Sequence, residues 1–408
     1  MKRICNIVTA VLFAAFLFTF AAAFVLLPDG SFSAEENRTL AQFPEFSWER
    51  LADGTFSSGI NEYFADQFPA RDLLVGIKGI AETVMLRGEN NGVLLGKDGQ
   101  LAVRRFKAYK SRLETTDDMD YYYESTLRLN MEGIGAWAEA AAGNGVRTVT
   151  VLPPRTVDVA SSALSYPDEI TRSIHETLVN GFSEKAGFID LLPLFRERFD
   201  AGEYVYLRGD HHWTTRGAYL CYREIMKAFG MEDAILPEDA FDVEPVPGFY
   251  GTTWSRAGYK FVGPDELEVW TVGDEDLLET VCLSEKIVKG EDGKPTKALE
   301  AYDSFPGWMR REHFGEKDKY AAFLDGTHNV QTVFRADGEA RERLLILKDS
   351  FANTLVPFLS RHFDLVILNL AGGVADGSRY LEEFGASRAL IVYNWENLIT
   401  NTNPATIK

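Results

Sequence analysis

The sequence predicts an α/β domain with a mostly parallel sheet, preceded by an N-terminal membrane-spanning helix. Two observations favour the α/β class. Short apolar runs recur at 344–347, 365–368 and 389–392 with helical sequence between the first two, and a β-branched run at 146–152 directly follows a helical pattern. Strands that alternate with helices are typical of a parallel sheet, because a crossover must return the chain to its starting edge. A third observation, the apolar run at 4–27, predicts the membrane helix.

The apolar run at 4–27 is long enough to cross a bilayer. As a helix it would span about 36 Å at roughly 1.5 Å per residue, and the hydrocarbon core is about 30 Å thick. The apolar run of a secretory signal peptide is usually shorter, about 7–15 residues. Lys2 and Arg3 precede the run, and acidic residues follow it. This asymmetry predicts a single-pass signal anchor over 1–27 that places the rest of the chain outside the cytoplasm. The alternative is a secreted or periplasmic protein, cleaved near Ala21–Ala23.

The next segments are expected to be a lead-in at 28–90 and a globular domain at 91–408. Helical periodicity covers 56–86, with a break at Phe68-Pro69, because a residue before proline disfavours the α conformation. Asp98-Gly99 lies between two apolar runs, and this pattern predicts a tight β-hairpin.

Three helices are predicted farther along the chain. One carries a buried Trp137 and ends near the glycines at 143–145. The second covers 214–229, with Thr214 as its cap. The third lies between the strands at 344–347 and 365–368, and Pro357 should kink or delay it. The acidic stretch from 231 to about 300, which is rich in glycine and proline, gives no clear prediction.

Composition limits the possible partners. The formal net charge is −19, which argues against a nucleic-acid partner, because phosphate binding needs clustered Lys and Arg. A polyanionic substrate would require a locally basic cleft. The three cysteines form no CxxC motif, so a thiolate zinc site is not expected. Cys221 and Cys282 could pair in an oxidising compartment or remain buried thiols.

The first candidate site is Asp210-His211-His212-Trp213, just before the helix at 214–229. An Asp two residues before a His on a tight turn can bind the imidazole Nδ1, which leaves Nε2 free as a base. Isolated Asp-X-His sequences are more often ordinary loops, but two adjacent histidines beside Asp and Trp are unusual in a chain with six histidines. A metal site is the alternative, since Asp and His are ligands. We expect neither a metal nor a cofactor, because no further aspartate pattern lies upstream.

The second candidate site is Ser350, which follows the strand at 344–347 and begins a helix. A serine there projects from the carboxyl edge of the sheet, where α/β active sites form. Its own N–H and the helix N-terminus can stabilise an oxyanion. Taken alone, Ser350 could simply be a helix cap. Together, Ser350, His212 and Asp210 supply a nucleophile, a base and an orienting carboxylate.

Five short blocks resemble, in the right order, motifs of the DHHW proteins and the related SGNH-like alginate O-acetyltransferases: Glu36-Asn37-Arg38-Thr39-Leu40, Asp66-Gln67-Phe68-Pro69-Ala70-Arg71-Asp72, Gly96-Lys97-Asp98-Gly99, Asp210-His211-His212-Trp213 and Lys348-Asp349-Ser350-Phe351-Ala352-Asn353. The resemblance implies a three-layer α/β/α SGNH-hydrolase-like domain. Many SGNH hydrolases place Ser first, so the order Asp, His, Ser implies a circularly rearranged domain. Lys348 stands where the common G-D-S block has glycine. Asn353 and Gly326 are candidates for the oxyanion hole, and Arg155, His211 and Trp213 are candidates for substrate contacts.

The function that this resemblance implies is transfer of an acetyl group to a hydroxyl of a cell-surface polysaccharide, through an acyl-Ser350 intermediate. No acetyl-CoA pool exists outside the cytoplasm, so a membrane-bound O-acyltransferase-like protein is expected to deliver the acyl group. One alternative is a carbohydrate acetyl esterase, because the same three residues serve when water replaces the sugar. Another is a non-catalytic glycan-binding or assembly protein that keeps the fold.

Overall fold

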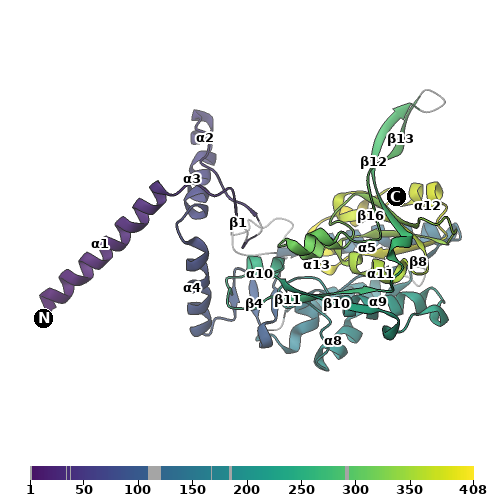
Figure 1. Ribbon diagram of the computed structural model, residues 1–408, viewed down its shortest axis with the longest axis horizontal. Coiled ribbons are helices and arrows are strands. Elements are labelled where there is room, and N and C mark those ends of the chain that lie inside the picture. The colour runs from purple at the N-terminus through teal and green to yellow at the C-terminus, as the bar shows by residue number, and fades with distance from the viewer. Residues whose placement is uncertain are drawn as a thin grey trace. The chain divides into compact units, whose positions relative to one another are not determined.

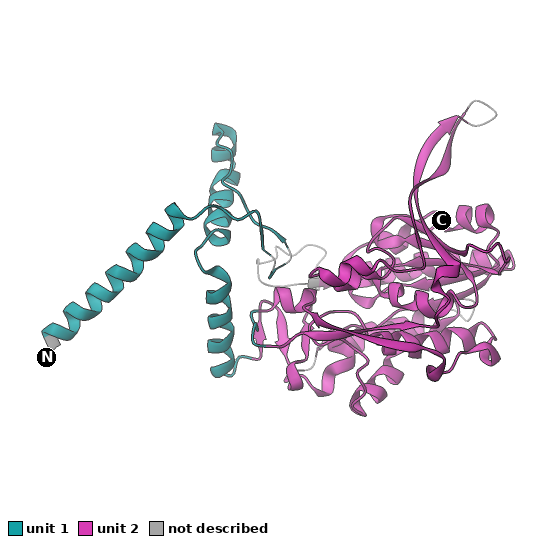
Figure 2. Cartoon of the chain, in the orientation of Figure 1, with its two compact units in different colours: residues 1–87, 258–261 teal, residues 88–257, 262–408 magenta. Residues whose placement is uncertain are grey.

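The computed structural model describes residues 2–33, 35–36, 38–108, 121–166, 168–182, 186–289 and 294–408. The chain forms two compact units, which Figure 2 shows in different colours. The first consists of residues 1–87 with 258–261, and the second of residues 88–257 with 262–408.

The first unit is mainly helical. Its elements are α1 (Lys2–Leu26), β1 (Phe32–Ser33), β2 (Arg38–Thr39), α2 (Trp48–Ala52), α3 (Thr55–Asp66) and α4 (Arg71–Val84). Helix α1 is long and apolar enough to cross a membrane, which agrees with the predicted span. The predicted break at Phe68-Pro69 is confirmed, because α3 ends before it and α4 begins after it.

Two of the motif blocks meet inside the first unit. Arg38 binds both carboxylate oxygens of Asp66, at 2.7 and 2.5 Å. Arg71 binds Glu36 at 2.5 Å. Asn37 of the same block lies outside the described residues. These charged residues therefore tie the β1–β2 segment to the α3–α4 junction.

The second unit is built on an eight-stranded mixed sheet in the order β13-β12-β14-β16-β15-β17-β8-β9. The strand bounds in that order are Pro295–Pro306, Leu278–Lys289, Val330–Arg335, Asp364–Asn369, Arg343–Lys348, Arg388–Val392, Arg147–Val151 and Phe188–Ile189. Strands β16, β15, β17, β8 and β9 are parallel, whereas β12, β13 and β14 join antiparallel. The predicted α/β class is confirmed. The hairpin β12–β13 extends well beyond the rest of its unit (Figure 1).

Smaller sheets and helices complete the unit. The sheets pair β3 (Glu89–Asn90) with β4 (Val93–Leu95) and β5 (Leu101–Val103), β6 (Phe106–Ala108) with β7 (Tyr121–Tyr123), and β10 (Asp242–Phe249) with β11 (Asp265–Thr271). The helices are α5 (Glu124–Gly143), α6 (Thr156–Val159), α7 (Ile170–Gly181), α8 (Leu192–Asp200), α9 (Thr215–Ala228), α10 (Thr252–Arg256), α11 (Val356–Leu359), α12 (Gly377–Phe384) and α13 (Trp395–Thr400). The predicted hairpin around Asp98-Gly99, the helix that carries Trp137 and the helix capped by Thr214 are all present.

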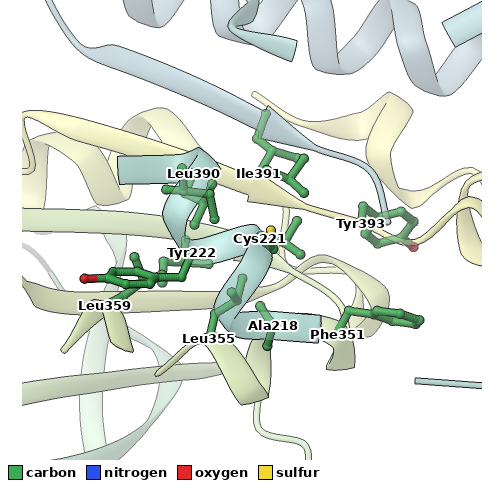
Figure 3. Packing of buried hydrophobic residues seen from close by; sticks show 14 of the residues in the cluster. Ala218, Cys221, Tyr222, Phe351, Leu355, Leu359, Leu390, Ile391 and Tyr393 are labelled. Atoms are coloured by element: carbon green, nitrogen blue, oxygen red, sulfur yellow. The ribbon is translucent and has the colours of Figure 1, made fainter. Parts of the chain in front are cut away.

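The central strands are buried on both faces. Every residue of β16 is buried, and so are Leu344–Lys348 of β15. Successive side chains of a strand point to opposite faces, so complete burial means that both faces of the sheet are covered. Figure 3 shows residues of α9 packed among residues of β17 and of the segment after Ser350: Ala218, Cys221, Tyr222, Leu355, Leu359 and Leu390. Cys221 and Cys282 are both buried free thiols, which decides between the two alternatives left open by the sequence.

The carboxyl ends of three parallel strands converge on one edge. Strand β15 leads into Ser350, β17 into Asn394 and β8 into Arg155. Ligands of open α/β sheets bind at this edge, because the loops that leave neighbouring strands lie side by side there.

Candidate active site

The candidate base lies on the loop 209–213, which is held at both ends. On one side, the backbone of Tyr206 forms an isolated β-bridge with that of Trp213. On the other, Thr214 caps α9 by accepting a hydrogen bond from the N–H of Gly217 at 3.1 Å. The loop therefore presents its side chains from a rigid frame.

The structure brings Asp210, His212 and Ser350 into one hydrogen-bonded chain. His212 Nδ1 lies 2.5 Å from Asp210 Oδ1, and His212 Nε2 lies 2.7 Å from Ser350 Oγ. Asp210 and His212 are buried, whereas Ser350 is half-buried and keeps some contact with solvent. This is the arrangement that a nucleophile, its general base and an orienting carboxylate require.

The Asp210 carboxylate is kept ionised. Burial alone would raise its pKa, but the imidazoles of His211 and His212 and several hydrogen bonds hold the pKa of Asp210 well below its usual range. Oδ2 accepts from Thr252 N at 2.7 Å and from Thr252 Oγ1 at 2.9 Å. An ionised carboxylate can only accept, so His212 Nδ1 carries the proton, and Nε2 can receive one from Ser350.

Two other rings lie against the ring of His212. Tyr320 stacks on it with a centroid distance of 4.0 Å and an angle of 12°. His211 lies against it at 3.9 Å. Tyr320 also donates its hydroxyl to the backbone oxygen of Ser350 at 3.0 Å. One tyrosine therefore contacts both the base and the nucleophile turn.

Trp213 lies behind the site rather than in it. Its side chain is fully buried, and Nε1 donates to Phe351 O at 3.1 Å and to Thr354 Oγ1 at 2.8 Å. This position suits a residue that joins the histidine loop to the nucleophile turn. It does not suit the substrate contact for which Trp213 was a candidate.

The turn at Ser350 is fixed by its two neighbours. Asp349 accepts from Phe351 N at 3.0 Å through one oxygen, and from Asn394 N and Asn397 Nδ2 at 2.7 and 2.8 Å through the other. Lys348 donates to Asn353 Oδ1 at 2.5 Å. Burial lowers the pKa of Lys348 to about 8.

One oxyanion donor is available at the nucleophile itself. Within the described ranges, the backbone N–H of Ser350 donates to no protein acceptor. The other two candidates are engaged elsewhere. Asn353 is buried, and its amide faces the carbonyl oxygens of Phe323 and Gly326, both at 3.5 Å. The N–H of Gly326 donates to Phe323 O at 3.3 Å.

The same loop offers a group of potential metal ligands. Ligand atoms of Asp210, His211 and His212 all lie within 4.8 Å of one another. However, both oxygens of Asp210 already accept hydrogen bonds from His212 and Thr252. A metal would have to displace these donors and would break the link to Ser350.

A cavity of about 240 Å³ lies beside the triad. It is lined by Val103, Arg155, Thr156, Val157, His211, Thr252, Thr253, Arg256, Asn394, Glu396 and Asn397. Two of the expected substrate contacts, Arg155 and His211, therefore face a common space.

Several residues of the site were not anticipated from the sequence. Thr252 holds Asp210, Tyr320 covers His212, and Asn394 and Asn397 hold Asp349. Of these, Asn394 alone carried a usable signal, because it follows the predicted strand at 389–392 and could be expected at the active edge.

Comparison with known proteins confirms the resemblance that the motifs predict. Residues 36–89 match the model of the DHHW protein family, and residues 113–250 match that of the SGNH hydrolase-like domain of the acetyltransferase AlgX. No curated protein matches the sequence.

Three solved structures share the fold. Bacillus cereus PatB1 with a sulfonyl adduct is 18% identical with a TM-score of 0.55, covering 78% of this chain and 100% of its own. A second PatB1 structure is 18% identical with a TM-score of 0.56, and the match covers 76% of this chain and 98% of its own. A DHHW family protein from Eubacterium siraeum is 17% identical with a TM-score of 0.52, and the match covers 77% of this chain and 97% of its own.

Proposed function

We propose that this chain is an extracytoplasmic serine O-acetyltransferase that modifies a cell-surface polysaccharide through an acyl-Ser350 intermediate. The observation that carries the proposal is the chain of hydrogen bonds from Asp210 through His212 to Ser350, with 2.7 Å between His212 Nε2 and Ser350 Oγ. The match to the model of the acetyltransferase AlgX supports the reaction class.

In the first half-reaction, Ser350 Oγ attacks the carbonyl carbon of an acyl ester while His212 Nε2 takes its proton. Asp210 stabilises the imidazolium that forms, and the N–H of Ser350 binds the oxyanion. The tetrahedral intermediate then collapses, and the leaving oxygen receives the proton from His212. Acetyl-Ser350 remains.

In the second half-reaction, a sugar hydroxyl attacks acetyl-Ser350 and gives its proton to His212. When the intermediate collapses, Ser350 Oγ leaves and regains the proton, and the acetyl ester stays on the sugar. The same steps with water give acetate. Because Ser350 is half-exposed and water could reach it, a carbohydrate acetyl esterase is the second candidate function.

The location and partners in this proposal follow from helix α1. The helix is consistent with an anchor or a signal sequence, and either would place the site outside the cytoplasm. A membrane-bound O-acyltransferase-like protein would supply the acyl group, since acetyl-CoA is absent there. The acceptor would be a surface glycan.

The proposal can be tested with a sulfonyl fluoride and with Ser350→Ala. The full chain in detergent should gain one sulfonyl group on the peptide that carries Ser350, and the variant should gain none. Ester turnover by Ser350→Ala should fall by about 10⁴ or more. Ser284→Ala, on the distant strand β12, is the control and should behave like wild type. More than a tenth of wild-type turnover in Ser350→Ala would contradict the assignment of Ser350 as the nucleophile. No ester turnover by wild type would favour a non-catalytic glycan-binding role.

The partition of acetate separates the two enzymes. With an aryl acetate as donor and oligosaccharides present, a transferase should place acetyl groups on sugar hydroxyls. If all acetate appeared free in water at every oligosaccharide concentration, the esterase would be the better description.

A further inference from the structure

Residues that line the cavity also contact the triad or its immediate neighbour. His211 lines the cavity and lies against the ring of His212 at 3.9 Å. Asn394 and Asn397 also line it, and both bind Asp349, the neighbour of Ser350. At about 240 Å³ it is smaller than pockets for drug-sized ligands, which are roughly 300–1,000 Å³. This size suits a single sugar ring.

The tautomer of His211 follows from its hydrogen bonds. Thr252 Oγ1 has one proton and donates it to the ionised Asp210 at 2.9 Å. His211 Nδ1 lies 2.7 Å from the same Oγ1, so Nδ1 must carry a hydrogen and donate it. Nε2 therefore has a lone pair, and it has no hydrogen-bond partner among the residues that the structure describes. Loss of solvent and the neighbouring His212 lower the pKa of His211, which favours this neutral form.

Arg155 contributes a donor without an acceptor. Its Nε and Nη2 bind Asp158 at 2.8 and 2.6 Å, and Nη2 also lies 3.2 Å from Asp168. Nη1 is buried and has no hydrogen-bond partner in the described part of the chain. A buried donor is normally satisfied, so its position on the cavity wall indicates a ligand oxygen.

The charges around the cavity balance and so do not favour an anionic ligand: the charged lining residues and their ion-pair partners are the cations Arg155, Arg256 and Arg105 and the carboxylates Asp158, Asp168 and Glu396. The cation of Arg155 is already matched by Asp158 and Asp168. Glu396, another lining residue, pairs with Arg105. The chain as a whole carries a formal charge of −19, which would further repel a polyanion.

We infer that this cavity is the acceptor subsite and that it takes a neutral sugar ring. One hydroxyl of the sugar donates to His211 Nε2, and a hydroxyl or amide oxygen accepts from Arg155 Nη1. The apolar side chains of Val103 and Val157 face the C–H groups of the ring. This inference rests on the proposed function and specifies its acceptor, which is a neutral glycan and not a uronic-acid polymer.

The test uses the full chain in detergent, an aryl acetate as donor, and oligosaccharides of equal length. Neutral oligomers of glucose and N-acetylglucosamine should accept acetyl groups, and oligouronates should not. In His211→Gln, the KM for the neutral acceptor should rise about tenfold. The rate at which acetyl-Ser350 forms should fall by a smaller factor. Val103→Trp, which fills the cavity, should likewise slow transfer more than acyl-enzyme formation. His328→Gln, outside the cavity, is the control and should match wild type.

The outcomes separate this inference from the function on which it rests. If wild type formed no acyl-enzyme, the proposed function would fail. If acyl-enzyme formed but transfer preferred oligouronates, or kept its KM in His211→Gln, the subsite assignment alone would be wrong. If acyl-enzyme formed but neither acceptor took the acetyl group, the transferase proposal would fail together with the subsite, in favour of the esterase.

Discussion

His212 performs the proton transfers of the proposed reaction, and its ring has little freedom to move. Asp210 Oδ1 lies 2.5 Å from Nδ1. The rings of Tyr320 and His211 lie against the His212 ring, with centroid distances of 4.0 and 3.9 Å. Such restraint matters because a general base must lie within hydrogen-bond reach of the proton that it removes.

Replacement of the two adjacent histidines should have unequal effects. His212→Ala removes the base and should lower acyl-enzyme formation by several orders of magnitude. His211→Ala removes a ring contact and the donor to Thr252, so its effect on the same step should be milder. Stopped-flow assays with an aryl acetate measure both. Equal rates for His212→Ala and wild type would contradict the assignment of the base.

Chelation should leave the reaction intact. Both carboxylate oxygens of Asp210 accept hydrogen bonds from His212 and Thr252. The proposed chemistry needs these hydrogen bonds, whereas a metal site would need the same oxygens as ligands. After dialysis against EDTA, turnover of the aryl acetate should equal that of the untreated protein. If turnover were lost and one divalent metal restored it, residues 210–212 would be a metal site and the prediction would be wrong.

Lys348 should give stability an unusual pH dependence. Burial lowers its folded pKa to about 8, below the unfolded value near 10.4. Between these values the unfolded chain binds more protons, so stability should rise with pH from about 8 to 10. The gain approaches about 1.4 kcal/mol per unit of pKa difference. Chemical denaturation of wild type and Lys348→Met across this range measures it, and parallel curves for the two proteins would contradict it.

The elements that the sequence could predict are those with a clear apolar pattern or a clear helix cap. The buried strands β15, β16 and β17 read as continuous apolar runs, and α9 shows its cap at Thr214. The stretch from 231 to 300 gave no prediction because strands β10 and β13 are mostly exposed and show no regular apolar pattern. β12 alternates only over its first half and is mostly exposed beyond Leu283.

The segment after Ser350 differs from the single helix predicted there. A 3₁₀ turn over Ser350–Leu355 precedes the short helix α11. Asp349 caps that turn, and Pro357 stands in the first turn of α11, so proline delays the regular helix as expected. The triad could be assembled from the sequence because each member sits in a recognisable local motif. Thr252 and Tyr320 could not, because tertiary packing alone brings them to the site.

Helix α10, whose first residue Thr252 binds Asp210, should tolerate no side chain at its N-cap residue Gly251. A Cβ there would lie 2.3 Å from Asp210 Cβ, so the carboxylate or the start of α10 must move. Gly251→Ala should therefore slow acyl-enzyme formation by at least about tenfold. Gly263→Ala is the matched control, because a Cβ at Gly263 meets nothing within 4 Å. Equal rates for the two variants would show that Asp210 does not depend on this close contact.

At the scale of the whole molecule, we expect helix α1 to remain attached as an anchor. Its 24-residue apolar span is longer than the core of a typical signal peptide. The full-length chain should fractionate with membranes and resist extraction by high salt, since a spanning helix is held by the hydrophobic effect and not by charge. N-terminal sequencing that found mature protein beginning near Phe24 would show a cleaved signal instead.

The most direct measurement of the central claim is peptide mass spectrometry of the full chain, quenched in acid during turnover of an aryl acetate. The account predicts one acetyl group on the peptide that carries Ser350. The group should be absent from Ser350→Ala and scarce in His212→Ala. An acetyl group on another residue, or none during measurable turnover, would contradict the assignment of Ser350 as the nucleophile.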